Sequence, residues 1–120
     1  MPNMQAVVMS RTGGPEVSEV QSLPVPELPS PKHLRVRLHA AGINPVDTKL
    51  RANGTYYPDR LPTILGCDGA GVVEAVGEKV SRFHPGDKVY FCSGGIGGEP
   101  GNYATYNTVH EDYAARMPAN

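Results

Sequence analysis

The amino-acid sequence predicts a mainly β fold, a partly open β-barrel with short helices. Short apolar runs recur about every ten residues with glycine or proline between them, which is typical of an all-β barrel or sandwich. One of these runs, residues 34–41, alternates apolar and polar side chains as a half-buried strand does. The 14 glycines and 12 prolines fit frequent turns, and 120 residues are enough for one core. We therefore expect a single domain.

The chain begins with a short predicted strand and a proline-spaced connection. Ala6–Met9 is an apolar run that is followed by the turn at residues 13–15. Leu23–Pro31 contains four prolines, which fix φ and remove backbone donors, so it is predicted to be extended and non-helical. Such a segment also suits an SH3 ligand. An edge connection inside the domain is the better interpretation, because a strand resumes directly after it.

The alternating segment is the clearest strand in the sequence. Its first set of positions is Leu34, Val36, Leu38 and Ala40, and Leu34, Val36 and Leu38 are predicted to face the core. The other set faces away, namely Arg35, Arg37, His39 and Ala41. Gly42 ends the pattern. Further strands are predicted at residues 71–77, 87–92, 103–109 and 113–117.

One segment, Asn44–Gly54, breaks the β pattern and predicts a short helix. Asn44 is a good N-cap residue, and the Asp47 side chain can reach back in the first turn. Gly54 suits the position just after the last turn. Val46 and Leu50 are four residues apart, so both would face the core.

Composition and charge exclude several functional classes. The 11 basic and 12 acidic residues are interspersed, so no basic stripe predicts a nucleic-acid partner. No apolar run is long enough to span a bilayer, and the N-terminus lacks the pattern of a signal peptide. The two cysteines, Cys67 and Cys92, show no disulfide framework. We expect a cytoplasmic protein without a membrane partner.

A glycine cluster, residues 94–98, is the nearest match to a phosphate-binding loop. It precedes a strand-like segment rather than a helix, and Pro100 and Gly101 follow it closely. A phosphate-cradling loop opens a helix, so this cluster is interpreted as a flexible loop.

Three collinear segments carry a family resemblance. They are residues 40–47 (AAGINPVD), 65–77 (LGCDGAGVVEAVG) and 83–89 (FHPGDKV). In this order and spacing the chain resembles the N-terminal catalytic domain of the medium-chain dehydrogenase/reductase superfamily. Within it the chain is similar to the zinc-free quinone oxidoreductase, or zeta-crystallin-like, branch. The opening GGPEV at residues 13–17 fits that branch too.

The resemblance implies a GroES-like barrel over residues 1–120, followed in the family by a Rossmann domain that this chain lacks. It also implies the substrate-side half of an enzyme that reduces quinones or α,β-unsaturated carbonyls by hydride transfer, inactive by itself. NADPH would be bound mainly by the missing domain, and the full-length protein would be a homodimer. Two alternatives stay open: a stand-alone GroES-like interaction module and a zinc-dependent alcohol dehydrogenase domain.

The residues at the family's zinc positions argue against a catalytic zinc. The cysteine ligand is replaced by Asn44, and the Gly-His-Glu motif reads Gly66-Cys67-Asp68. An amide is a poor zinc ligand, and one thiolate with one carboxylate falls short of the usual three protein ligands. The four histidines show no paired spacing (His33, His39, His84 and His110). No bound metal is expected.

The resemblance also implies a set of site residues. Asn44 and Tyr56 are the candidate catalytic residues, and Asn44 and Asp47 the candidate cofactor contacts. Tyr57, Cys67 and Asp68 are candidates for the substrate cleft. Each also has a structural explanation: a helix cap for Asn44, a helix-terminal charge for Asp47, packing for the tyrosines, and burial with a partner for Asp68. The carboxylate beside Cys67 is expected to raise the pKa of this thiol.

Overall fold

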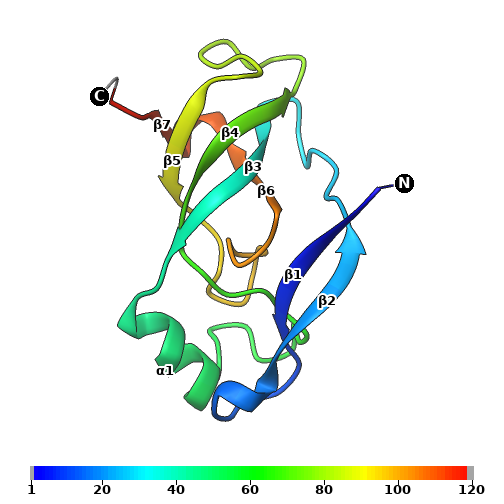
Figure 1. Ribbon diagram of the computed structural model, residues 1–120, viewed down its shortest axis with the longest axis vertical. Helices are drawn as coiled ribbons and strands as arrows, with labels where there is room; N and C mark the ends of the chain where they lie inside the picture. The colour runs from blue at the N-terminus through cyan, green and yellow to red at the C-terminus, as the bar shows by residue number, and fades with distance from the viewer. Residues whose placement is uncertain (1, 119–120) are drawn as a thin grey trace.

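The computed structural model describes residues 2–118 as two antiparallel sheets and one α-helix (Figure 1). Strands β1 (Asn3–Met9) and β2 (Ser18–Pro24) pair with each other, and the short 3-10 helix η1 (Pro15–Val17) precedes β2. The second sheet has five strands in the order β6-β3-β4-β5-β7. Their bounds are β3 (His33–Gly42), β4 (Asp68–Val76), β5 (Lys88–Cys92), β6 (Tyr106–His110) and β7 (Ala114–Arg116). A second 3-10 turn, η2 (Glu111–Tyr113), joins the last two.

The two sheets are joined through the residues that precede β6. The backbone N–H of Val7 donates to the Tyr103 carbonyl at 2.8 Å, and the Thr105 N–H donates to the Gln5 carbonyl at 2.9 Å. These bonds attach β1 to the five-stranded sheet without a continuous ladder. The predicted mainly β, partly open barrel is confirmed, because the strands do not close into a ring.

The main hydrophobic core lies on one face of the five-stranded sheet. Side chains from five strands and one loop fill it: Leu34, Val36, Val73, Phe83, Val89, Phe91, Val109 and Ala114. A smaller cluster packs the helix against β1 and η1 through Met9, Val17, Leu50 and Leu65. This second cluster fixes the start of the helix relative to the sheets.

The predicted core face of β3 is confirmed for Leu34 and Val36. Both are fully buried, Leu38 is half-buried, and Arg37 is exposed. Ala40, at the next alternate position, is exposed. The pairing of β3 with β4 shifts register between Leu38 and Ala40, and such a bulge breaks the period of two.

The other strands differ from prediction mainly at their ends. Strand β2 was not predicted, because Ser18–Pro24 is largely exposed and carries no apolar face of its own. The predicted strand at 103–109 begins only at Tyr106, since residues 103–105 bond to β1 instead. The connection after Pro24 is non-helical as predicted.

Helix α1 (Pro45–Asn53) is confirmed with both predicted ends. Asn44 is the N-cap residue, and Gly54 follows the last turn with a φ of 109°, a conformation that favours glycine. Leu50 is buried and Val46 packs beside it. No helix in residues 2–118 is long and apolar enough to cross a membrane.

Candidate functional site

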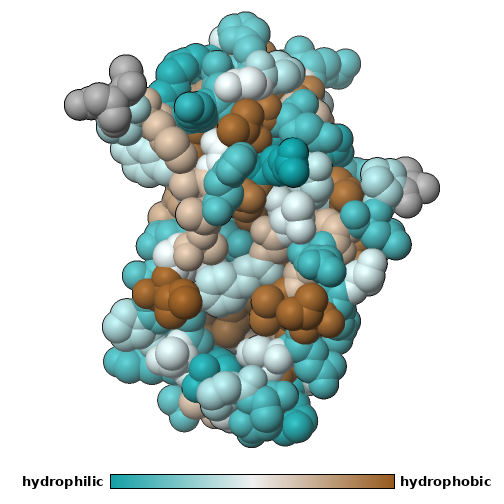
Figure 2. Space-filling model, in the orientation of Figure 1, coloured by the Kyte–Doolittle hydropathy of each residue, from teal (hydrophilic) through white to brown (hydrophobic). Residues whose placement is uncertain are grey.

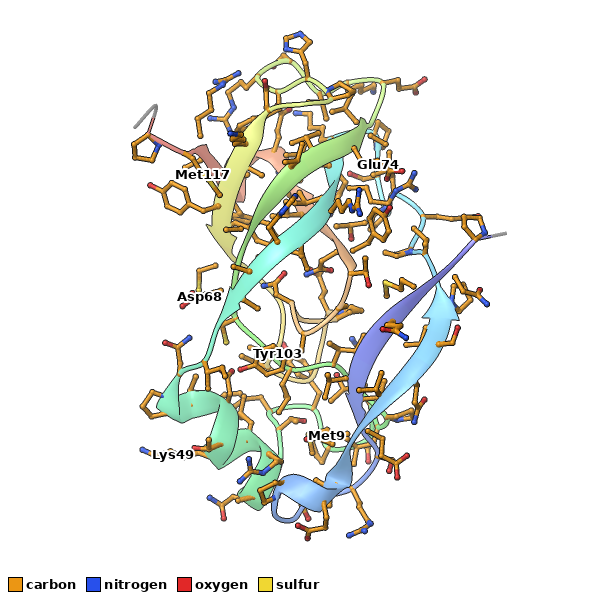
Figure 3. All side chains as sticks on the ribbon, viewed as in Figure 1. Met9, Lys49, Asp68, Glu74, Tyr103 and Met117 are labelled. Atoms are coloured by element: carbon orange, nitrogen blue, oxygen red, sulfur yellow. The ribbon has the colours of Figure 1, made fainter. Side chains whose placement is uncertain are left out.

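The site residues gather where β3 ends and α1 begins. Figure 3 shows Asp68 at the end of β4 nearest the helix, and Tyr103 in the middle of the molecule between α1 and the β1–β2 pair. Strands β3 and β4 are antiparallel neighbours, and Gly42 pairs with Asp68. Because the chain turns into α1 only two residues after Gly42, Asn44 lies beside the first residue of β4.

The Asn44 side chain is oriented by Asp68. Its amide Nδ2 donates to the Asp68 Oδ2 at 2.9 Å. A carboxylate only accepts hydrogen bonds, so the NH₂ end of the amide must face Asp68. The predicted capping position of Asn44 is correct, yet its amide also forms this link to β4. The structure thus brings together Asn44 and Asp68, two residues that the sequence analysis assigned to the same candidate site.

Asp47 is buried beneath this pair, with 4% of its surface exposed. Its Oδ2 accepts from the Asn44 backbone N–H at 2.9 Å and from the Tyr103 hydroxyl at 2.7 Å. The first of these bonds is the predicted reach of Asp47 back to the helix N-terminus. Its Oδ1 lies 3.9 Å from the Cys67 Sγ. None of the ion pairs among residues 2–118 involves Asp47 or Asp68, so hydrogen bonds hold both carboxylates.

Tyr103 is the residue of this network that the sequence analysis missed. It was noted only as the start of a strand, and no local motif marks it. A Cβ added to Gly66 would lie 2.8 Å from the Tyr103 ring, so glycine there lets the ring pack on the backbone. The neighbouring Asn102 is 1% exposed, and its side-chain amide donates to the Gly66 carbonyl at 3.0 Å. The buried Asn107 in turn donates to the Asn102 Oδ1 at 2.8 Å.

The electrostatics of the site keep its titratable donors neutral. Burial, with the hydrogen bond and negative charge of Asp47, raises the pKa of Tyr103. Burial first, and then Asp47, raises the pKa of the Cys67 thiol; the adjacent carboxylate expected from the sequence, Asp68, acts in the same direction as a smaller cause. Burial and Asp68 raise the pKa of Cys92, which pairs with Asp68 across β4 and β5. Both cysteines are free thiols, and neither is activated as a nucleophile.

Tyr56 and Tyr57 lie away from this network, in the loop after α1. Tyr56 is 73% exposed and Tyr57 is 42% exposed. The Tyr57 ring packs on Gly98, and the Arg60 guanidinium lies 5.4 Å from its ring centre. No hydrogen bond within residues 2–118 joins either tyrosine to Asn44 or Asp68.

The glycine cluster at 94–98 lies beside this loop rather than at a helix end. An added Cβ at Gly97 would collide with Thr55, and one at Gly95 with the backbone of Gly66. The cluster therefore allows backbone segments to approach closely. That packing role differs from the flexible loop expected from the sequence.

Two hollows lie on either side of the hydrogen-bonded group. An open groove of about 460 Å³ is lined by Ala40, Gly42, Asp68, Gly69, Ala70, Tyr90, Phe91 and Cys92. A smaller hollow of about 170 Å³ beneath α1 includes Met9, Ile43, Asp47, Arg51, Leu65 and Tyr103 in its lining. The groove falls within the size range of small-ligand sites and contains the Asp68 side of the network.

The described residues do not assemble a metal-binding cluster. Nowhere in residues 2–118 do three or more His, Cys, Asp or Glu side chains gather in a way that could hold a metal ion. Asn44 bonds to both nearby carboxylates, through its backbone N–H to Asp47 and through its side-chain amide to Asp68.

Comparison with known proteins places the fold in a family. The model of the alcohol dehydrogenase GroES-like domain matches residues 30–119. The chain belongs to this family. It is 39% identical over 115 residues to the quinone oxidoreductase of Sus scrofa, covering 96% of this chain and 34% of that protein. The GroES-like domain therefore spans about a third of the curated relatives that it matches.

Solved structures agree with this membership. The quinone oxidoreductase from Coxiella burnetii superposes with a TM-score of 0.90 at 29% identity, covering 98% of this chain and 38% of that one. A mycobacterial protein solved as a complex with NADPH superposes with a TM-score of 0.83 at 31% identity, covering 97% of this chain and 34% of that one. The resemblance identified from the three sequence motifs is confirmed.

Proposed function

We propose that residues 1–120 form the substrate-side domain of an NADPH-dependent oxidoreductase that reduces quinones or α,β-unsaturated carbonyls. The observation that carries the proposal is the Asn44–Asp68 pair at the edge of an open groove, in a domain similar to quinone oxidoreductases. A nucleotide-binding domain outside this chain would supply the phosphate and adenosine contacts. By itself the chain would then be inactive.

Asn44 is the central residue of the proposed site. With one amide N–H donated to Asp68, the amide keeps a second N–H and its carbonyl oxygen for a ligand. An N–H donor can stabilise the oxyanion that forms when a quinone or enone accepts a hydride. The carbonyl oxygen can accept a hydrogen bond from a carboxamide, which is the group carried by a nicotinamide. Asp47 would support cofactor binding indirectly, because its carboxylate accepts a hydrogen bond from the Asn44 backbone N–H and so holds that backbone in place.

The remaining proposed residues line the substrate side. Tyr56 would donate its phenol to the substrate carbonyl, and Tyr57 would stack on or border the ring. Because both lie in the exposed loop after α1, they would approach the groove when a ligand or a second domain covers it. Cys67 and Asp68 would shape the cleft, with Cys67 as a neutral, small side chain.

The groove, with a volume of about 460 Å³, is large enough for a ring-sized group. NADPH, when bound, supplies the hydride itself. The chain would position the acceptor ring, exclude water from the Asn44 side of the groove, and offer neutral hydrogen-bond donors. Quinones and enones suit such a site, because their reduction delocalises the negative charge and needs no strong Lewis acid.

The donor set of the site does not suit zinc. Asn44 stands where the zinc-dependent alternative needs a cysteine ligand, and an amide is a poor zinc ligand; Cys67 stands where that alternative needs a histidine. We expect no stoichiometric zinc after mild dialysis against a chelator. Elemental analysis that finds about one zinc per chain would favour the zinc-dependent alcohol dehydrogenase instead.

The proposal is tested by quinone-dependent oxidation of NADPH in the full-length protein. Asn44→Ala should lower kcat by about 10-fold or more, because an oxyanion donor is worth a few kcal/mol. Asn53→Ala, at the exposed last residue of the same helix, is the matched control and should keep full activity. Unchanged turnover in Asn44→Ala, with the fold intact, would leave Asn44 as a helix cap. Absence of quinone-dependent oxidation would reject the proposed reaction.

A further inference from the structure

We infer that Tyr103 is a positioning residue for Asn44, acting through the buried carboxylate of Asp47. The inference rests on the proposed function, because it adds a residue to the site that function uses. Tyr103 reaches the site from the segment before β6, and its hydroxyl donates to the same Asp47 oxygen as the Asn44 backbone N–H. Figure 3 shows it between the helix and the β1–β2 pair, where it is half-buried.

The first step concerns what holds Asp47. Its Oδ2 accepts from the Tyr103 hydroxyl at 2.7 Å and from the Asn44 backbone N–H at 2.9 Å. The carboxylate is 4% exposed and forms no ion pair within residues 2–118. A buried carboxylate without a cation depends on its hydrogen-bond donors. Of the two side chains that donate to this carboxylate, the Tyr103 hydroxyl at 2.7 Å is the stronger donor, since the Cys67 Sγ lies 3.9 Å from the other oxygen.

The second step leads from Asp47 to the amide. The bond to the Asn44 N–H sets the backbone of the N-cap residue, and the Asn44 side chain leaves that backbone to donate to Asp68 at 2.9 Å. A shift of Asp47 would shift the N-cap backbone and lengthen the bond to Asp68. Small displacements of a positioned donor reduce catalysis strongly.

The third step concerns what holds Tyr103 itself. Its ring packs on Gly66, and its backbone N–H donates to the Leu65 carbonyl at 3.2 Å. The preceding residue, Asn102, donates two hydrogen bonds to the Gly66 carbonyl. Its backbone N–H does so at 2.8 Å and its side-chain amide at 3.0 Å. Since Gly66 precedes Cys67 and Asp68, the same segment supports the tyrosine and the acceptor of the Asn44 amide. Tyr103 is thus held rigidly relative to Asp68.

The experiment compares Tyr103→Phe with Tyr106→Phe. Phenylalanine keeps the packed ring and removes only the hydroxyl, and Tyr106 is a half-buried tyrosine of β6 outside the network. In the NMR spectrum of this chain, the Asn44 side-chain NH₂ signals should move in Tyr103→Phe toward those of the exposed Asn53 and exchange faster with water. Tyr106→Phe should leave the Asn44 signals unchanged. Unchanged Asn44 signals in Tyr103→Phe would overturn the inference.

The second readout is kinetic, in the full-length protein. Tyr103→Phe should lower kcat for quinone reduction by about 10-fold, with KM for the quinone within about 2-fold of the unaltered protein, because the Asn44 N–H acts on the oxyanion that forms during the reaction. Asp47→Asn in the same background should give little further loss, because both changes act through one carboxylate. If the Asn44 signals move but kcat does not, Tyr103 is structural and the inference fails. If the unaltered protein does not reduce quinones while the signals still move, the proposed reaction fails and the link from Tyr103 to Asn44 stands.

Discussion

The properties of the individual side chains at this site are set by the hydrogen bonds and charges of their neighbours. Asp47, Asn44 and Tyr103 have ordinary functional groups, and burial joins them into one hydrogen-bonded unit. For single residues the quantity to test is the pKa, because burial and a nearby charge act directly on it.

The pKa of Tyr103 reports its contact with Asp47. In Asp47→Asn the negative charge is lost, so the phenolate of Tyr103 should form at lower pH than in the unaltered chain. Burial, which is the larger cause of the raised pKa, remains, so the value should stay above that of a free tyrosine. Ultraviolet titration of the phenolates, with Tyr103→Phe used to assign the signal, measures this. A titration that does not change would mean that the contact is absent in solution.

A second titration concerns His33, which lies opposite His110 across β3 and β6 with ring centres 5.4 Å apart. Burial and then His110 lower the pKa of His33, with Glu99 acting weakly in the other direction. A lowered pKa in the folded state means that the unfolded chain binds the proton more tightly. Folding stability is therefore expected to fall as the pH drops below about 6.5, the ordinary value for histidine.

The matched variants for this prediction are His33→Gln and His84→Gln. Urea unfolding at about pH 7.5 and about pH 5 should show a smaller loss of stability in His33→Gln than in the unaltered chain. The exposed His84 serves as the control and should change nothing. Equal pH dependence in all three proteins would contradict the assignment.

Among the secondary-structure elements, β3 contributes to both the core and the site. It lies between β6 and β4 in the sheet, and its last residues place Asn44 beside Asp68. In the first half of the strand, one face is buried in the core and the other is partly or fully exposed to solvent. Substitutions on neighbouring positions should therefore differ greatly in cost.

Val36→Asp should unfold the domain, because it places an unpaired charge at a position with 0% exposure. The expected loss of stability is more than about 4 kcal/mol. Arg37→Asp, on the exposed face, should change stability by no more than about 0.5 kcal/mol. Urea unfolding of both variants gives the comparison, and equal losses would show that the face assignment is wrong.

Across the whole molecule, neither the glycine cluster nor the N-terminus of α1, the two candidate phosphate sites within residues 2–118, is free to bind a phosphate. In Figure 2 hydrophobic side chains form separate patches on this face, with polar residues between them. The glycine cluster at 94–98 packs against Thr55 and Gly66, and the N-terminus of α1 already has the Asp47 carboxylate on its backbone. A negative charge at that helix end repels phosphate rather than binding it.

This chain alone should therefore show no measurable binding of NADPH, whereas the full-length protein should bind it. Calorimetric titration of both proteins is the test. Saturable binding by the chain alone, with a Kd in the micromolar range, would contradict the proposal that a further domain recognises the cofactor. Gel filtration of the chain separates the remaining alternative, because a ring-forming GroES-like module would elute as a large oligomer.

The sequence by itself determined the elements with a local signal. The alternating side chains at residues 34–38 set the buried face of β3, because a strand has a period of two. Asn44, Asp47 and Gly54 marked both ends of α1, since caps act within one or two turns. The three motifs also identified the family, and four of the six candidate residues, Asn44, Asp47, Cys67 and Asp68, do lie together.

Only the tertiary structure decided how those residues contact one another. The Tyr103 hydroxyl meets Asp47 across 56 positions of sequence, and the Asn44 amide meets Asp68 across 24. Strand β2 forms because β1 pairs with it, and the bulge at the end of β3 exposes Ala40. These features depend on the order of strands in the sheets and on their register. Periodicity and capping do not encode either of these, because both signals extend over only a few residues along the chain.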